Sequence, residues 1–184
     1  MEATISDLEL IEGIFTRIGS DLEAILDHEL IFEDIQTERA TRRLAGEDQV
    51  HISFKLGVQR GDEWLHGSLL VPLPEAISMA CFLMMAPDDV VEANRSLDAP
   101  DEAMKDAMLE VGNFVAGAAD SVLRTFFPED RTVRAEGCQG VRADVRPAFP
   151  YREGEELIVG RAFACLHSYP AFEMLLMLPA RCLE

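Results

Sequence analysis

The sequence lacks the short motifs by which many catalytic and metal-binding sites are recognised. Its four cysteines are widely spaced with no CxxC, and its four histidines are equally scattered with no HExxH. It contains neither a glycine-rich phosphate loop nor a GxSxG nucleophile elbow. The cysteines are therefore interpreted as reduced structural residues. No metal site and no cofactor of the chain's own are expected.

Long apolar runs and positive charge are also scarce. The longest apolar run, Ala76 to Pro87, is too short to span a bilayer. The amino terminus carries acids where a signal peptide carries Lys or Arg, so a cytoplasmic location is expected. The 16 Lys and Arg are outnumbered by 34 Asp and Glu, which gives a formal net charge of -18. This charge disfavours nucleic acid and anionic membranes as partners and favours a protein with a basic patch.

What is present is typical of one globular domain. At 184 residues and 48% hydrophobic content, the chain is expected to form a single domain over 1–184 with a sizeable core. Apolar periodicity and turn residues predict its elements. They are a helix at 5–27, a strand or irregular segment at 30–38, a charged connection at 39–49, strands at 51–59 and 64–73, a short apolar helix from Pro74 that ends before Pro87, a polar loop at 87–99, a long helix at 100–126 capped by Asp98, strands at about 132–136 and 140–147, and a hairpin of strands at 157–165 and 172–178.

The two halves of the chain, about 5–86 and 100–179, resemble each other. Each is read as a helix followed by antiparallel strands. The apolar stripes of the two helices align, with Leu8, Ile11, Phe15, Ile18 and Leu22 over Met108, Val111, Val115, Ala118 and Val122. The pattern predicts an α+β fold with a pseudo-twofold repeat, in which two long helices pack on one face of an antiparallel sheet of about six strands.

The second long helix carries polar residues opposite its apolar stripe. At roughly 100° per residue, one face collects two acids, an amide and a glycine, namely Asp106, Glu110, Asn113 and Gly117. The glycine would let another backbone approach closely. In the matching places of the first helix this alignment puts Ser6, Leu10 and Gly13, so only the second helix has the acid–amide pair. An ordinary solvated helix face is the alternative interpretation, since a helical Asn costs only about 0.5 kcal/mol against Ala.

The string Asp106-x3-Glu110-x2-Asn113, continued by Gly117, resembles the active-site helix of the CheC/CheX/FliY family. These are phosphatases of the phosphorylated chemotaxis response regulator CheY, and one intact motif beside one blank copy is similar to the CheX branch. The resemblance implies that Asn113 orients the attacking water and that Glu110 binds the receiver's active-site lysine. It implies partner contacts for Asp106 and Gly117, and a homodimer. The only metal it implies is Mg²⁺ on the partner receiver domain.

One feature departs from the family pattern, which usually carries a proline a little over twenty residues after the Asn. Here that neighbourhood is Arg134 to Gly137, and the nearest prolines are Pro128 and Pro147. A loop of different length or course is therefore expected after the helix. Two other functions stay open: a non-catalytic binding module akin to FliM and FliN of the flagellar switch, and a phosphatase for a receiver domain outside chemotaxis.

Overall fold

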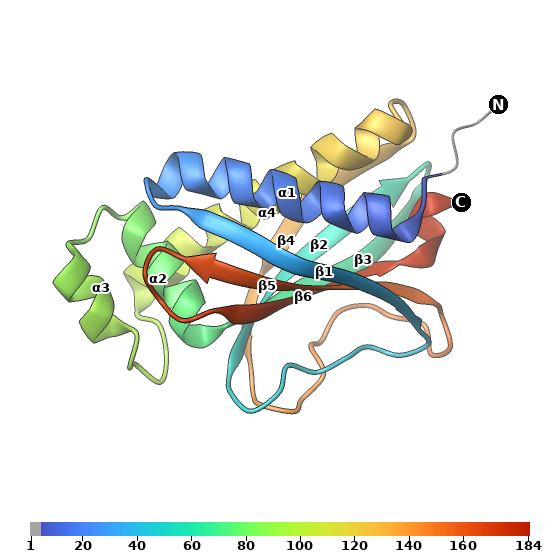
Figure 1. The fold of residues 1–184 in the computed structure, drawn as a ribbon. Helices are drawn as coiled ribbons and strands as arrows, with labels where there is room; N and C mark the ends of the chain where they lie inside the picture. The colour runs from blue at the N-terminus through green and yellow to red at the C-terminus, as the bar shows by residue number, and fades with distance from the viewer. Residues whose placement is uncertain (1–4) are drawn as a thin grey trace.

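The computed structural model describes residues 5–184, which form a six-stranded sheet with two long helices along one face (Figure 1). The helices are α1 (Asp7–Leu26), α2 (Leu73–Leu83), α3 (Asp88–Asn94) and α4 (Glu102–Phe126), with a 3-10 turn, η1, at Ala180–Leu183. The strands are β1 (Leu30–Ala40), β2 (His51–Arg60), β3 (Glu63–Pro72), β4 (Arg131–Val141), β5 (Leu157–Leu166) and β6 (Phe172–Pro179). The predicted α+β fold is confirmed, while the start of the predicted 1–184 domain, at 1–4, lies outside the described residues.

The strand order expresses the predicted twofold relation. All neighbouring strands are antiparallel, in the order β1-β5-β6-β3-β2-β4. Exchanging β1 with β4, β2 with β5 and β3 with β6 gives the same order reversed. Both halves of the chain therefore contribute equivalent strands to one continuous sheet. Of the helices in 5–184, none combines the length and the apolar character needed to cross a membrane.

The sheet has a large core under the helices and a small one on its opposite face. Successive side chains of a strand point to opposite faces, so Leu69 of β3 joins the helix-side core and Leu70 the other. Two long loops, 41–50 and 142–156, cover that second face and hang below the sheet in Figure 1. The loop side chains that pack there are Leu44, Phe149 and Tyr151.

Helix α1 follows the sequence prediction closely. Ser6 caps it in a capping box with Glu9, and Asp27 ends it in the left-handed region at φ 54. Leu8, predicted to lie in the core stripe, is instead 42% exposed. Leu8 lies in the first turn of the helix, before the buried stripe, which begins with Leu10 and Ile11.

The register of the repeat differs from the prediction by three residues. Each of the eight buried residues of α1 matches a buried residue of α4 when Leu10 is aligned with Ala107 and Leu26 with Leu123. Under this alignment Glu110 corresponds to Gly13, and Asn113 to Thr16. The predicted equivalence of Leu10 with Glu110 is therefore wrong. A shift of three is close to one helical turn, so apolar letters alone do not separate the two registers.

A reciprocal contact supports the corrected register. Phe15 of α1 lies over Gly160, the fourth residue of β5, whose added Cβ would be 3.2 Å from the Phe15 ring. Phe54, the fourth residue of β2, lies against Gly112 of α4, whose added Cβ would be 3.3 Å from the Phe54 ring. Both rings thus come from the first half of the chain and both glycines from the second, so one contact has the ring on the helix and its pseudo-twofold counterpart has the ring on the strand.

The segment 87–99, predicted as a polar loop, contains helix α3. Only Val91 of this seven-residue helix is buried, so it has no apolar stripe by which periodicity could reveal it. The cap of α4 is Asp101, whose side chain accepts a hydrogen bond from the Met104 N–H at 2.8 Å. The predicted cap, Asp98, lies three residues before it, and the helix begins at Glu102 rather than at 100.

Strand β4 replaces the two predicted strands at 132–136 and 140–147. It runs unbroken from Arg131 to Val141 through a bulge, where Gly137 adopts φ 99. At the bulge, Glu136 reaches across Gly57 of β2 to His66 of β3, with 2.7 Å between its Oε2 and the His66 Nδ1. The neighbourhood of the missing family proline, Arg134 to Gly137, is therefore part of a bulged strand.

Candidate functional site

Helix α4 is held rigidly on the sheet, so its outer face is a fixed platform. Its inner face contributes buried residues from Met104 to Leu123 to the main core. The Asp120 carboxylate accepts a hydrogen bond from the Val133 N–H of β4 at 2.7 Å, which joins the helix to the strand that follows it. The Arg124 Nε lies 3.0 Å from the same carboxylate.

The four predicted site residues, Asp106, Glu110, Asn113 and Gly117, are all exposed and share the outer face of α4. The Asn113 Nδ2 donates a long hydrogen bond of 3.4 Å to the Glu110 Oε2. Within the described part of the chain, neither group makes another side-chain hydrogen bond. An amide and a carboxylate one helical turn apart therefore point together into solvent, as their spacing predicted.

Gly117 completes the row, and no contact within residues 5–184 requires a glycine there. A Cβ added there would have no atom within 4 Å apart from its own chain neighbours and helix backbone. An exposed glycine in a helix costs about 0.5–1 kcal/mol relative to Ala. The chain therefore carries a destabilising residue where it gains no contact of its own, next to the acid–amide pair.

Two apolar side chains border the polar row and were missed by the sequence analysis. Leu109 is 44% exposed and Phe114 is 36% exposed, and helical geometry puts them on opposite sides of Glu110 and Asn113. The sequence could have revealed them, because a large apolar residue outside the apolar stripe of a helix is expected to be exposed. A polar centre with an apolar rim suits docking of another protein.

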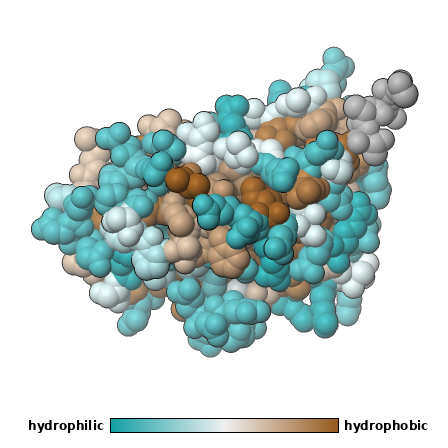
Figure 2. All heavy atoms as spheres, viewed as in Figure 1, coloured by the Kyte–Doolittle hydropathy of each residue, from teal (hydrophilic) through white to brown (hydrophobic). Residues whose placement is uncertain are grey.

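The charge of this face is negative. Asp106 and Glu110 make no ion pair within the described residues, whereas nearby Lys105 is engaged by Glu102 at 2.7 Å. The face is thus complementary to a cationic group of a partner, such as a lysine ammonium. The face shown in Figure 2 is also largely polar, with hydrophilic residues around separate hydrophobic patches over α1 and β1.

Three of the four cysteines are poor candidates for a nucleophile. All four are free, and Cys81 and Cys182 are buried. Burial raises the pKa of the Cys182 thiol to about 12 and also raises the pKa values of Cys81 and Cys138. A thiol with a raised pKa carries little thiolate at neutral pH, so these three are structural.

Comparison with solved structures identifies proteins of the same fold. FliY from Thermotoga maritima superposes with a TM-score of 0.69 at 13% identity, covering 96% of this chain and 89% of that one. The FliM middle domain from H. pylori gives 0.66 at 11% identity, covering 97% and 95%. The chemotaxis protein CheX from Desulfovibrio desulfuricans gives 0.57 at 14% identity, covering 92% and 99%. No protein-family model and no curated protein matches the sequence.

The resemblance to the CheC/CheX/FliY family is thereby confirmed at the level of the fold. The similarity extends over nearly the whole chain and nearly the whole of each neighbour. At identities this low, the comparison shows only a shared fold. The chemistry has to be argued from the residues of the site.

Proposed function

We propose that the chain is a phosphatase that accelerates hydrolysis of the aspartyl phosphate on a CheY-like receiver domain. The observation that carries the proposal is the exposed Glu110–Asn113 pair, 3.4 Å apart on the outer face of α4. The fold shared with CheX and FliY supports it. A cytoplasmic location is part of the proposal, since a response regulator is found there.

The main task of the phosphatase in this reaction is to position the attacking water. An aspartyl phosphate already lies beside the receiver's own Mg²⁺ and lysine, so hydrolysis mainly needs a water held in line with the bond that breaks. The Asn113 amide suits this role, because it both donates and accepts hydrogen bonds and does not titrate. The chain needs no metal for this step, and the Mg²⁺ is held by the receiver.

Glu110 has a separate role in docking. Its carboxylate lies one turn from Asn113, and it is free to accept hydrogen bonds from the receiver's lysine ammonium. Asp106 extends the negative row, while Leu109 and Phe114 supply apolar contacts beside it. Gly117 leaves room for close approach of the partner's backbone. Recognition and water positioning are thus assigned to different side chains.

A binding module of the flagellar switch is the second candidate. Its support is the FliM middle domain, which superposes with a higher TM-score than CheX, 0.66 against 0.57. The apolar rim of Leu109 and Phe114 would serve such docking equally well. The intact acid–amide pair favours the phosphatase, because a scaffold has no use for a water-positioning amide.

The test is the decay of receiver phosphate in a single turnover, with and without the protein. A phosphatase accelerates the decay, and Asn113→Ala removes the acceleration while leaving binding largely intact, because positioning acts mainly in the transition state. Glu110→Ala weakens binding as well. Binding without any acceleration by the unmodified chain would favour the scaffold. Wild-type rates from Asn113→Ala would refute its assigned role.

The homodimer implied by the resemblance stays a prediction. Light scattering at micromolar concentration checks it directly, and a monomeric mass would contradict it. The outcome does not affect the assignment of Glu110 and Asn113, because both lie on one chain and one helix.

A further inference from the structure

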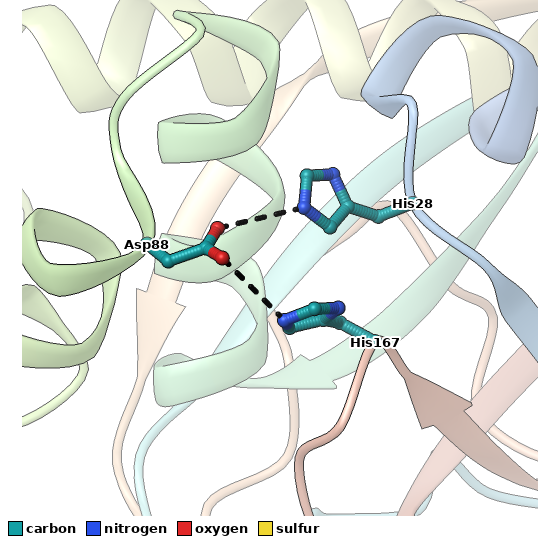
Figure 3. Close-up of side chains that lie close together, drawn as sticks. All are labelled: His28, Asp88 and His167. Carbon is teal, nitrogen blue, oxygen red and sulfur yellow. Dashed lines mark ion pairs between the residues drawn. The ribbon is translucent and has the colours of Figure 1, made fainter.

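We propose that one end of the molecule binds a divalent transition-metal ion, with Zn²⁺ the best fit, through His28, Asp88 and His167. Figure 3 shows the two imidazole rings directed at the Asp88 carboxylate. The three residues lie far apart in the sequence: in the turn between α1 and β1, at the start of α3, and in the turn between β5 and β6. Their potential ligand atoms all lie within 4.8 Å of one another.

The distances suit a shared ion better than direct hydrogen bonds. The His28 Nε2 lies 3.7 Å from one Asp88 oxygen, and the His167 Nε2 lies 4.0 Å from the other. Both separations exceed the range of a hydrogen bond. Ligand atoms about 2.0–2.2 Å from a tetrahedral zinc ion are roughly 3.4 Å apart, so only small side-chain rotations would close the site.

In its neutral form, His28 leaves its metal-facing nitrogen without a proton. Its Nδ1 lies 2.7 Å from the main-chain carbonyl oxygen of Leu26. A carbonyl can only accept, so Nδ1 must be the donor, and in the neutral ring Nε2 then carries a lone pair. This lone pair faces the Asp88 carboxylate, which also has only lone pairs to offer. A cation between them resolves the opposition, and an Nδ1–H bonded to a carbonyl is the usual arrangement in a metal-ligating histidine.

The two histidines are fixed by the fold rather than by long flexible loops. Leu30 and Leu166 are paired across β1 and β5, and the His167 N–H donates to the Glu29 carbonyl oxygen at 2.9 Å. The His28 ring stacks on Phe82, with centroids 3.7 Å apart. Such preorganisation lowers the cost of bringing ligands together. The Asp88 side chain is 71% exposed, so it has room to turn toward an ion.

The donor set indicates which ions fit. Two imidazoles and one carboxylate suit Zn²⁺ and related transition metals, whereas Mg²⁺ prefers oxygen ligands. Three protein ligands leave a fourth position for water. The bound ion would join α3 to two turns at one end of the sheet. The expected consequence is a more stable α3 and, because a native-state ligand stabilises the fold, a higher Tm.

The experiment uses the full chain without a histidine tag, freed of metal by a chelator. Calorimetric titration with Zn²⁺ should give saturable binding of one ion per chain, and Co²⁺ should give a visible absorption band of a nitrogen- and oxygen-ligated site. Mg²⁺ should neither bind comparably nor raise Tm. Absence of saturable one-to-one Zn²⁺ binding would overturn the proposal.

Matched variants assign the ion to these residues. Asp88→Asn and His167→Asn should each lower Zn²⁺ affinity by more than about tenfold, because even outer-sphere partners account for roughly 10–100-fold. Asparagine is chosen for His167 because it tolerates the φ of 55° found there. Asp89→Asn removes the same charge from the same turn and should bind as wild type. Equal affinity in Asp88→Asn and Asp89→Asn would show that the ion binds elsewhere, even if His167→Asn failed to fold.

Discussion

The two long helices, α1 and α4, are buried alike and differ on the side that faces away from the sheet. The same relative positions are buried in both, from Leu10 to Leu26 in α1 and from Ala107 to Leu123 in α4. On the outer side, Gly13 and Thr16 of α1 correspond to Glu110 and Asn113 of α4. Packing on the sheet thus imposes the same burial pattern on both helices. The residues on the outer face are not constrained in this way, and there only α4 has the acid–amide pair.

The difference has a steric component. A Cβ at Gly13 would lie 3.1 Å from the Val122 Cγ1, because α4 crosses α1 closely at this point. The equivalent Glu110 is exposed, with its carboxylate in solvent. Therefore α1 is restricted to a small residue where α4 carries its acid, and the pseudo-twofold fold provides one open platform rather than two.

The largest expected effect tests the packing that α1 and α4 share against the sheet. Phe15→Ala and Phe54→Ala should each lower the free energy of unfolding by about 3–5 kcal/mol, because each removes a buried ring that fills the space over a glycine. Urea denaturation of the two variants measures this. Losses of similar size would support equivalent packing at the two pseudo-twofold-related contacts, α1 on β5 and α4 on β2, and a loss under about 1 kcal/mol in either would contradict it.

The next effect tests the outer faces, where the two helices differ. Asn113→Ala should slow the decay of receiver phosphate by about 100-fold, the loss expected when a reacting group is misplaced by about an ångström. Thr16→Ala, at the corresponding position of α1, should leave the rate unchanged. Single-turnover decay with both variants gives the comparison. A comparable loss in Thr16→Ala would mean that both helices take part in the chemistry.

The fold was largely predictable because its signals are local. Alternation revealed the hairpin of β2 and β3, and a wide apolar stripe revealed α1 and α4. Helix α3 was missed because a short helix with only Val91 buried leaves no periodic pattern. Strand β4 was divided in two because the bulge at Gly137 looks like a turn in sequence.

The two candidate sites differ in how far apart their residues lie in the sequence, and this decides whether they could be predicted. Glu110 and Asn113 lie on one helix, so their spacing alone predicted that they share an exposed face. His28 and His167 come from two turns and Asp88 from the start of α3, and only the tertiary fold brings them together. Sequence spacing reveals sites that are built on one element and conceals sites that depend on tertiary folding.

Introducing the acid–amide pair of α4 into α1 tests whether the outer faces of the two helices are interchangeable. The double variant Gly13→Glu, Thr16→Asn should gain no second active site and should lose about 1–3 kcal/mol of stability, because the new side chain must displace Val122 or separate the helices. Denaturation and the phosphate decay assay on the same protein measure both effects. A rate above that of the wild type would instead mean that the α1 face is accessible to the receiver.

The smallest expected effect concerns the glycine beside the acid–amide pair. Gly117→Ala should raise the free energy of unfolding by about 0.5–1 kcal/mol, because the site has open space for a methyl group and alanine favours the helix. Gly13→Ala is the matched control in α1, where contact with Val122 offsets the same gain in helix propensity. Denaturation of the two variants should therefore rank Gly117→Ala as the more stable. If Gly117 provides room for the partner, the same variant should also bind the phosphorylated receiver more weakly, so that stability and affinity change in opposite directions. Unchanged affinity would remove Gly117 from the docking surface and leave Glu110 and Asn113 as its polar centre.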